Sequence, residues 1–101
     1  MDSSSNLLLT STNYFQWKSH MEDLLRSKGL YQITLGKEKT PTDDDKKATW
    51  ANMSDEACGL MGISISPNLR FHLKEIDDPK EAWEKIEFVF GKHNIIRAHN
   101  N

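Results

Sequence analysis

The sequence has little cysteine, no long apolar run and no excess of positive charge. Its single cysteine, Cys58, excludes an internal disulfide and fits a reducing compartment. No uninterrupted apolar run exceeds three residues, whereas a transmembrane helix needs about 20 apolar residues and a signal peptide about 7–15. Neither segment is predicted. Thirteen basic and fifteen acidic residues give a net charge of −2, which argues against a basic nucleic-acid-binding module.

Motifs of common catalytic and metal sites are also missing. The chain has no glycine-rich phosphate loop, no Gly-x-Ser-x-Gly and no His-Glu-x-x-His. The histidines lack the close pairing of a zinc site, so we expect surface positions for His20, His72, His93 and His99. Cys58 has the pattern of a small buried hydrophobe rather than a nucleophile. The aspartates at 43–45 lack the alternating ligands of a calcium loop. We predict no enzymatic activity, no metal and no cofactor.

The composition is that of one folded domain. The chain has 101 residues, and three tryptophans, four phenylalanines and two tyrosines supply large groups for a core. Trp17, Trp50 and Trp83 recur every 33 residues, but the residues around them do not recur, so a helical repeat is not predicted. We expect a flexible N-terminal arm over 1–12, whose leucines could dock on the domain, and a helical domain over 13–101.

The first predicted helix has the clearest pattern. Asn13 is a suitable N-cap, with Gln16 in the capping-box position. An apolar stripe follows at helical spacing, within an arc of about 100° that should face the core: Tyr14, Trp17, Met21, Leu24 and Leu25. Gly29 is expected directly after the helix, where a left-handed residue is common. Leu30 then opens a short helical turn.

A second long helix is predicted after a loop over 36–43. It should begin near Thr42, which can cap it, and the aspartates at 43–45 suit the positive end of the helix dipole. Its apolar face carries Trp50, Met53, Ala57, Leu60 and Met61.

Two further helix starts are predicted at 66–67 and 78–79. In both, a capping side chain precedes a proline, which suits the first helical position. The first of these helices carries Leu69 and Leu73, and the second carries Ala82, Trp83, Ile86, Val89 and Phe90. No segment has a strand-like run with a partner. The predicted fold class is therefore all-α, a small bundle of about four to five helices.

Three phenylalanines lie away from the main apolar stripes of their helices. They are Phe15, Phe71 and Phe88. One interpretation is that a central helix buries two sides. The other is that these rings form an apolar contact surface for a partner or a second copy. They are our candidate interface residues.

The predicted elements carry a set of residues in a distinctive order. The set comprises Asn13, Tyr14, Trp17, Met21, Leu24, Leu25, Gly29, Leu30, Trp50, Ala57, Leu69, Ala82, Trp83, Ile86 and Phe90. In order and spacing, these motifs resemble the N-terminal, capsid-like region of Gag polyproteins from Copia-type LTR retrotransposons. The resemblance covers roughly 7–101. The chain departs from the family at 10–12, where a glycine usually precedes the Asn-Tyr pair, and it stops before the family's later helices and zinc knuckle. It is thus expected to be a piece of a longer polyprotein.

This resemblance implies a fold like the N-terminal domain of a retroviral capsid and a structural function. Copies of the chain would self-associate, weakly in isolation, into a cytoplasmic virus-like particle around the element's RNA. RNA would be bound only indirectly, through regions outside this chain, and no membrane would be involved. The alternative is a domesticated Gag-derived module that binds a host protein. An enzyme and an RNA-binding helical domain are further, weaker alternatives.

Overall fold

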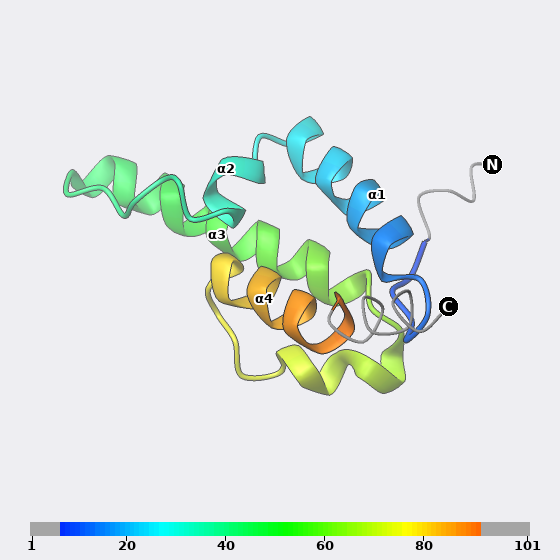
Figure 1. Ribbon diagram of the computed structural model, residues 1–101. Helices are drawn as coiled ribbons and strands as arrows, with labels where there is room; N and C mark the ends of the chain where they lie inside the picture. Colours follow the sequence, from blue (N-terminus) through cyan, green and yellow to red (C-terminus); the bar gives the residue numbers. More distant parts are fainter. Residues whose placement is uncertain (1–6, 92–101) are drawn as a thin grey trace.

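The computed structural model describes residues 7–91, and in this part of the chain every element is helical (Figure 1). The elements are α1 (Tyr14–Ser27), α2 (Tyr31–Thr34), α3 (Asp44–Ile63), the 3₁₀ helix η2 (Pro67–Leu73), α4 (Pro79–Ile86) and the π-helical turn η3 (Glu87–Gly91). The all-α prediction is confirmed. Within the described residues, no helix has the length and apolar character needed to span a membrane.

One buried cluster holds α1, α2, α4, η3 and the C-terminal half of α3 together. Its members are Leu9, Tyr14, Trp17, Met21, Leu25, Leu30, Ile33, Ala57, Met61, Ile65, Ala82, Trp83, Ile86 and Phe90. The rings of Trp17 and Trp83 lie 6.1 Å apart, which joins α1 to α4 at the centre. Three residues from the predicted core are only partly buried: Leu24, Trp50 and Leu69.

The start of α1 differs from the prediction, and its end agrees with it. Asn13 precedes the helix, but its side chain makes no capping hydrogen bond. It instead accepts from the Thr10 amide at 2.7 Å and donates to the Leu8 carbonyl at 2.9 Å, so the predicted capping box is absent. Gly29 follows the helix with φ +72°. The Leu30 amide then donates to the Leu25 carbonyl at 2.8 Å, which closes a Schellman turn.

The segment before α1 belongs to the packed domain from Leu9 onward. Leu9 is fully buried, and its amide donates to the Ser64 carbonyl at 2.8 Å. The Ser66 amide and hydroxyl donate to the Leu9 carbonyl at 3.0 and 2.9 Å. Leu9 therefore docks on the domain, as the sequence analysis allowed for the leucines of the predicted arm. Residues 1–6 of that arm, and 92–101 of the predicted domain, lie outside the described residues.

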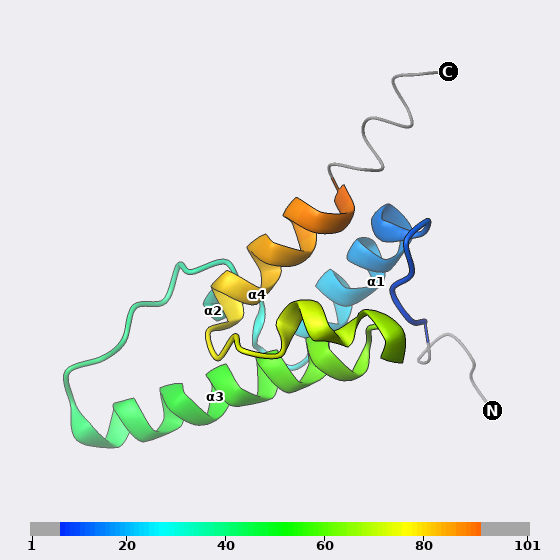
Figure 2. The same cartoon turned by 90° about the horizontal axis from the view of Figure 1, so that it is seen from below.

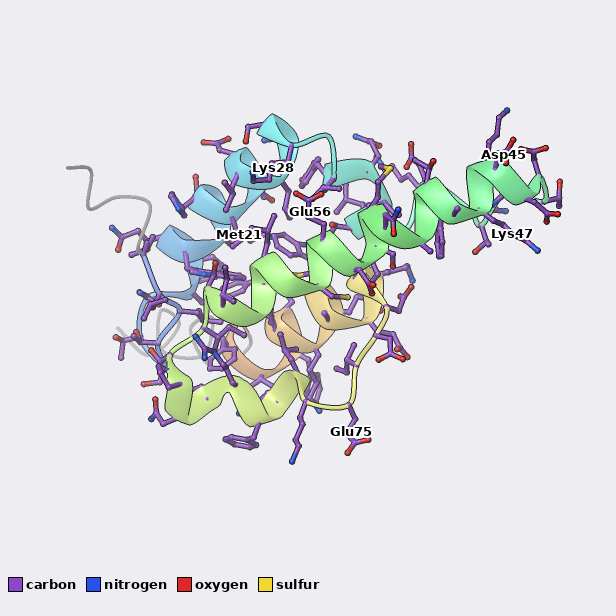
Figure 3. The ribbon with its side chains drawn as sticks, turned by 180° about the vertical axis from the view of Figure 1, so that it is seen from behind. Met21, Lys28, Asp45, Lys47, Glu56 and Glu75 are labelled. Carbon is purple, nitrogen blue, oxygen red and sulfur yellow. The ribbon has the colours of Figure 1, made fainter. Side chains whose placement is uncertain are left out.

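Helix α3 has two halves with different surroundings. Its C-terminal half lies in the body of the domain, while residues 44–53 project beyond it beside the loop that leads from α2 (Figures 1 and 2). Asp45 and Lys47 lie near the far end of this projecting half (Figure 3). The cap is Asp43 rather than Thr42, since the Lys46 amide donates to the Asp43 carboxylate at 3.2 Å.

Helix α4 begins as predicted and ends in an unpredicted way. Asp78 caps it, because the Glu81 amide donates to the Asp78 carboxylate at 3.0 Å, and Pro79 occupies the first turn. From Glu87 the helix widens into η3. Gly91 then lies directly against α1: a Cβ atom added there would be 2.9 Å from Cε2 of Tyr14. Only glycine permits this approach of the two elements.

Candidate interaction surface

Several large apolar side chains are exposed on the domain. The three candidate interface residues are among them: Phe15 is 51% exposed, Phe71 65% and Phe88 65%. Burial between two neighbouring helices is thus excluded for all three. Leu8 and Ile63 are also exposed, at 37% and 64%. Exposed aromatic rings of this size mark contact surfaces more often than isolated aliphatic residues do.

Two of the three phenylalanines line one groove between α1 and η3. This α1–η3 groove has a volume of about 340 Å³ and is lined by Tyr14, Phe15, Lys18, Glu84, Glu87, Phe88 and Gly91. Tyr14 and Gly91 are buried, and Phe15 and Phe88 are exposed. The rings of Tyr14 and Phe15 meet edge to face with centroids 5.1 Å apart. The groove therefore has an aromatic base and an exposed aromatic ring on each wall.

The two walls of the groove carry opposite charges. The α1 wall bears Lys18, whose ammonium lies 6.0 Å from the Tyr14 ring centroid. The opposite wall bears Glu84 and Glu87, and Glu84 also forms an ion pair with Lys80 at 3.0 Å. Burial, followed by the charges of Glu87 and Glu22, raises the pKa of Tyr14 to about 12. The tyrosine hydroxyl thus remains protonated at neutral pH.

Helical geometry explains why these two rings face outward. In α1, Phe15 follows Tyr14 and precedes the buried Trp17, so it lies about 100° from its neighbour on the stripe. Phe88 stands two residues before the buried Phe90 and is likewise turned away from the core. These positions could be identified from the sequence. Their juxtaposition could not, because it depends on the contact between Gly91 and Tyr14.

Phe71 belongs to a separate surface, which we call the Phe71 face. It includes a cavity of about 310 Å³ lined by Gly62, Arg70, Phe71, Leu73 and Lys74. The Phe71 ring lies 4.1 Å from that of His72, which in turn meets Phe90 edge-on at 5.5 Å. Helices α3 and α4 lie between η2 and α1 (Figures 1 and 3). The three predicted interface residues thus occupy two sides of the domain.

A third concave surface lies along the projecting half of α3. This Trp50 groove has a volume of about 500 Å³ and is lined by Glu38, Lys39, Pro41, Asp45, Lys46, Thr49, Trp50 and Met53. The Trp50 indole donates to the Glu38 carbonyl at 3.4 Å, so the loop packs along the helix. The sequence placed Trp50 in the core. It is instead partly exposed, because only the loop covers this half of α3.

The described residues show no metal-binding cluster, and their single cysteine is partly buried. Residues 7–91 contain no cluster of three or more histidine, cysteine or acidic side chains able to hold a metal. The Cys58 thiol donates to the Asp77 carbonyl at 3.2 Å, and burial, with Asp78, Asp55 and Asp77, raises its pKa to about 11. A thiol of this kind is protonated at neutral pH and is a poor nucleophile. His93 and His99 lie outside the described residues.

Comparison with family models, with curated proteins and with solved structures found no match for this chain. The interaction surfaces must therefore be interpreted from their own chemistry.

Proposed function

We propose that this chain is a structural, self-associating domain of the kind found at the N-terminus of Copia-type Gag polyproteins. In this function, copies of the chain contribute to a cytoplasmic virus-like particle around element RNA. The domain acts by contact alone, without catalysis or a cofactor. RNA is bound by regions outside the chain.

The order of the motif residues supports this proposal, and their packing is compatible with it. Three separate parts of the motif contribute to one buried cluster. They are represented there by Tyr14 and Trp17, by Ala57, and by Trp83 and Phe90. The exposed phenylalanines Phe15, Phe71 and Phe88 lie outside this motif. An assembly domain requires one set of residues to determine its fold and a second set to make contacts with other copies.

The observation that carries the proposal is the presence of exposed aromatic rings on two sides of one small domain. Phe15 and Phe88 flank the α1–η3 groove, and Phe71 lies on the other face. A single contact surface produces only a closed pair of copies. Two different surfaces allow each copy to bind more than one neighbour, which is the requirement for a shell. Each contact can be weak, because many contacts act together.

Sedimentation velocity from micromolar to near-millimolar concentration, at low and high salt, tests the proposal. We expect the average mass to rise with concentration, and high salt to leave the apolar part of the association intact. A strict monomer over the whole range contradicts self-association of this domain. Variants of the matched exposed phenylalanines, Phe71→Ala and Phe88→Ala, then show which face contributes.

The Trp50 groove favours a second candidate, a domesticated module that binds a host protein. It is the largest of the three surfaces described, and its apolar residues Pro41, Trp50 and Met53 lie on a projecting part of the domain. Trp is enriched at the centre of protein interfaces. Under this alternative the chain is monomeric at all concentrations, and Trp50→Ala abolishes capture of one defined partner while Phe88→Ala does not.

A further inference from the structure

The α1–η3 groove has the charge arrangement of a self-complementary surface. Its α1 wall carries Phe15 and the cation of Lys18. The opposite wall, which we call the η3 wall, carries Phe88 and Glu87 of η3 and Glu84 from the end of α4. A two-fold axis along the groove would set the α1 wall of each copy against the η3 wall of the other. Each lysine would then face two carboxylates, and this pairing would occur twice.

The other two surfaces lack this property. The lining of the Phe71 face contains Arg70 and Lys74 and no carboxylate. A two-fold contact there would place positive charges of the two copies together, which is unfavourable. In the Trp50 groove, the loop contributes Glu38 and Lys39 and the helix contributes Asp45 and Lys46, so each wall has both signs. Charge therefore selects no orientation of two copies at that groove.

The dimensions of the groove fit side chains rather than a large ligand. Its volume of about 340 Å³ lies at the small end of the roughly 300–1,000 Å³ of sites that hold small molecules. The exposed ring of Phe88 on one copy is an apolar group of suitable size for the groove of another. A contact formed by these few residues is smaller than the roughly 1,200–2,000 Å² of a stable interface. The association should thus be weak.

We propose that the α1–η3 groove is the two-fold contact between copies of this chain, with Phe15 and Phe88 of each copy packed together and Lys18 opposite Glu84 and Glu87 of its neighbour. This inference rests on the proposed function and specifies the surface that it uses. The Phe71 face remains available for a different contact, so the pair can be extended into a larger assembly.

The first arm of the test measures the monomer–dimer equilibrium by sedimentation velocity. We expect Phe88→Ala to raise the dissociation constant about tenfold or more, because aromatic residues at the centre of a contact dominate its energy. Phe71→Ala is the matched control, since both rings are 65% exposed, and should leave the dimerisation constant unchanged. Circular dichroism and urea unfolding establish that each variant is folded.

The second arm tests the opposed charges. Lys18→Glu places carboxylates against carboxylates in the homodimer, and Glu87→Lys places an ammonium near the partner's lysine, so each variant alone should dimerise less than the unaltered chain. An equimolar mixture should recover association. In the heterodimer, one pairing is again a lysine against two carboxylates, and the other sets the introduced carboxylate against the introduced ammonium. A high-salt series should reduce this recovery.

The outcomes separate the inference from the proposed function. If the unaltered chain dimerises and Phe88→Ala does not weaken it, or if the charge-reversed mixture recovers nothing, the groove is not the contact and the inference is overturned. Self-association then stands, and loss in Phe71→Ala would assign it to the other face. If the unaltered chain is monomeric throughout, the proposed function itself is contradicted.

Discussion

Trp17 in the body of the domain and Trp50 in the projecting half of α3 differ in their burial and in what packs against them. Trp17 is fully buried, packs against Trp83 and donates its indole N–H to the Ser64 carbonyl at 2.9 Å. Trp50 is partly exposed and lies against a loop. Both occupy apolar helical positions, so the difference arises from what lies opposite each helix. Helical periodicity identifies a face that can be buried but does not identify its partner.

The two halves of α3 differ in burial in the same way. In the body, Ala57 and Met61 of α3 are fully buried. In residues 44–53, every side chain is exposed or only partly buried. We therefore expect the body to unfold as a cooperative unit and the projecting half to open locally at lower free energy.

Replacing Trp17 and Trp50 in turn tests this difference most directly. Trp17→Ala should reduce the free energy of unfolding by about 3–5 kcal/mol, because it removes a large buried side chain and leaves a cavity. Trp50→Ala should cost about 1 kcal/mol or less. Urea unfolding followed by circular dichroism measures both. Equal losses for the two variants would show that the projecting half is as tightly packed as the body.

The bridge between the N-terminal segment and the end of α3 provides the next largest effect. Leu9→Ala should cost about 2–5 kcal/mol, as for other fully buried leucines. The neighbouring Leu8 is 37% exposed, and Leu8→Ala should change stability by only about 0.5 kcal/mol. Thermal and urea unfolding of the pair test this. A negligible effect of Leu9→Ala would restore the flexible arm that the sequence predicted.

Local signals explain why much of the fold could be predicted from the sequence. The Asp78–Pro79 pair, the Gly29 turn and the stripe from Tyr14 to Leu25 each depend on residues close in the chain. The failures involve distant residues. Asn13 has the chemistry of a cap, but its side chain hydrogen-bonds to the segment before it. Leu9 forms a parallel β-bridge with Ile65, and no local sequence pattern predicts this pairing.

The candidate site was predictable only as separate residues for the same reason. Phe15, Phe71 and Phe88 could be identified because each lies off a helical stripe. Which of them come together depends on the crossing of α1 and η3, and that crossing depends on the close approach of Gly91 to Tyr14. A glycine at the end of a helix has several local explanations, so its role as a contact point was not evident.

High pH should weaken the body of the domain, because Tyr14 is buried there. The pKa of Tyr14 is raised from 10.0 to about 12 in the folded state. Stability from the buried neutral hydroxyl is therefore complete below pH 10 and is lost as pH rises toward 12. Cys58 adds a loss of the same sign from pH 9, since its pKa rises from 9.0 to about 11.

The variants Tyr14→Phe and Cys58→Ser separate the two contributions at alkaline pH. Urea unfolding from pH 8 to 12 should show a shallower decline for each variant than for the unaltered chain. A decline in Tyr14→Phe as steep as in the unaltered chain would mean that the tyrosine does not control this dependence.

The two helix caps give the smallest and most discriminating effect. Asp43 and Asp78 make the same hydrogen bond, from a backbone amide three residues on, at 3.2 and 3.0 Å. Removing either by Asp→Ala should cost its helix about 1 kcal/mol. Asp78→Ala should appear in full in the global free energy of unfolding, because α4 cannot fray without exposing Ala82 and Trp83. Asp43→Ala should instead increase hydrogen exchange in residues 44–53, while global stability changes by a few tenths of a kcal/mol. If Asp43→Ala lowers global stability as much as Asp78→Ala does, the projecting half belongs to the cooperative unit, and Trp50 with its groove is part of the core.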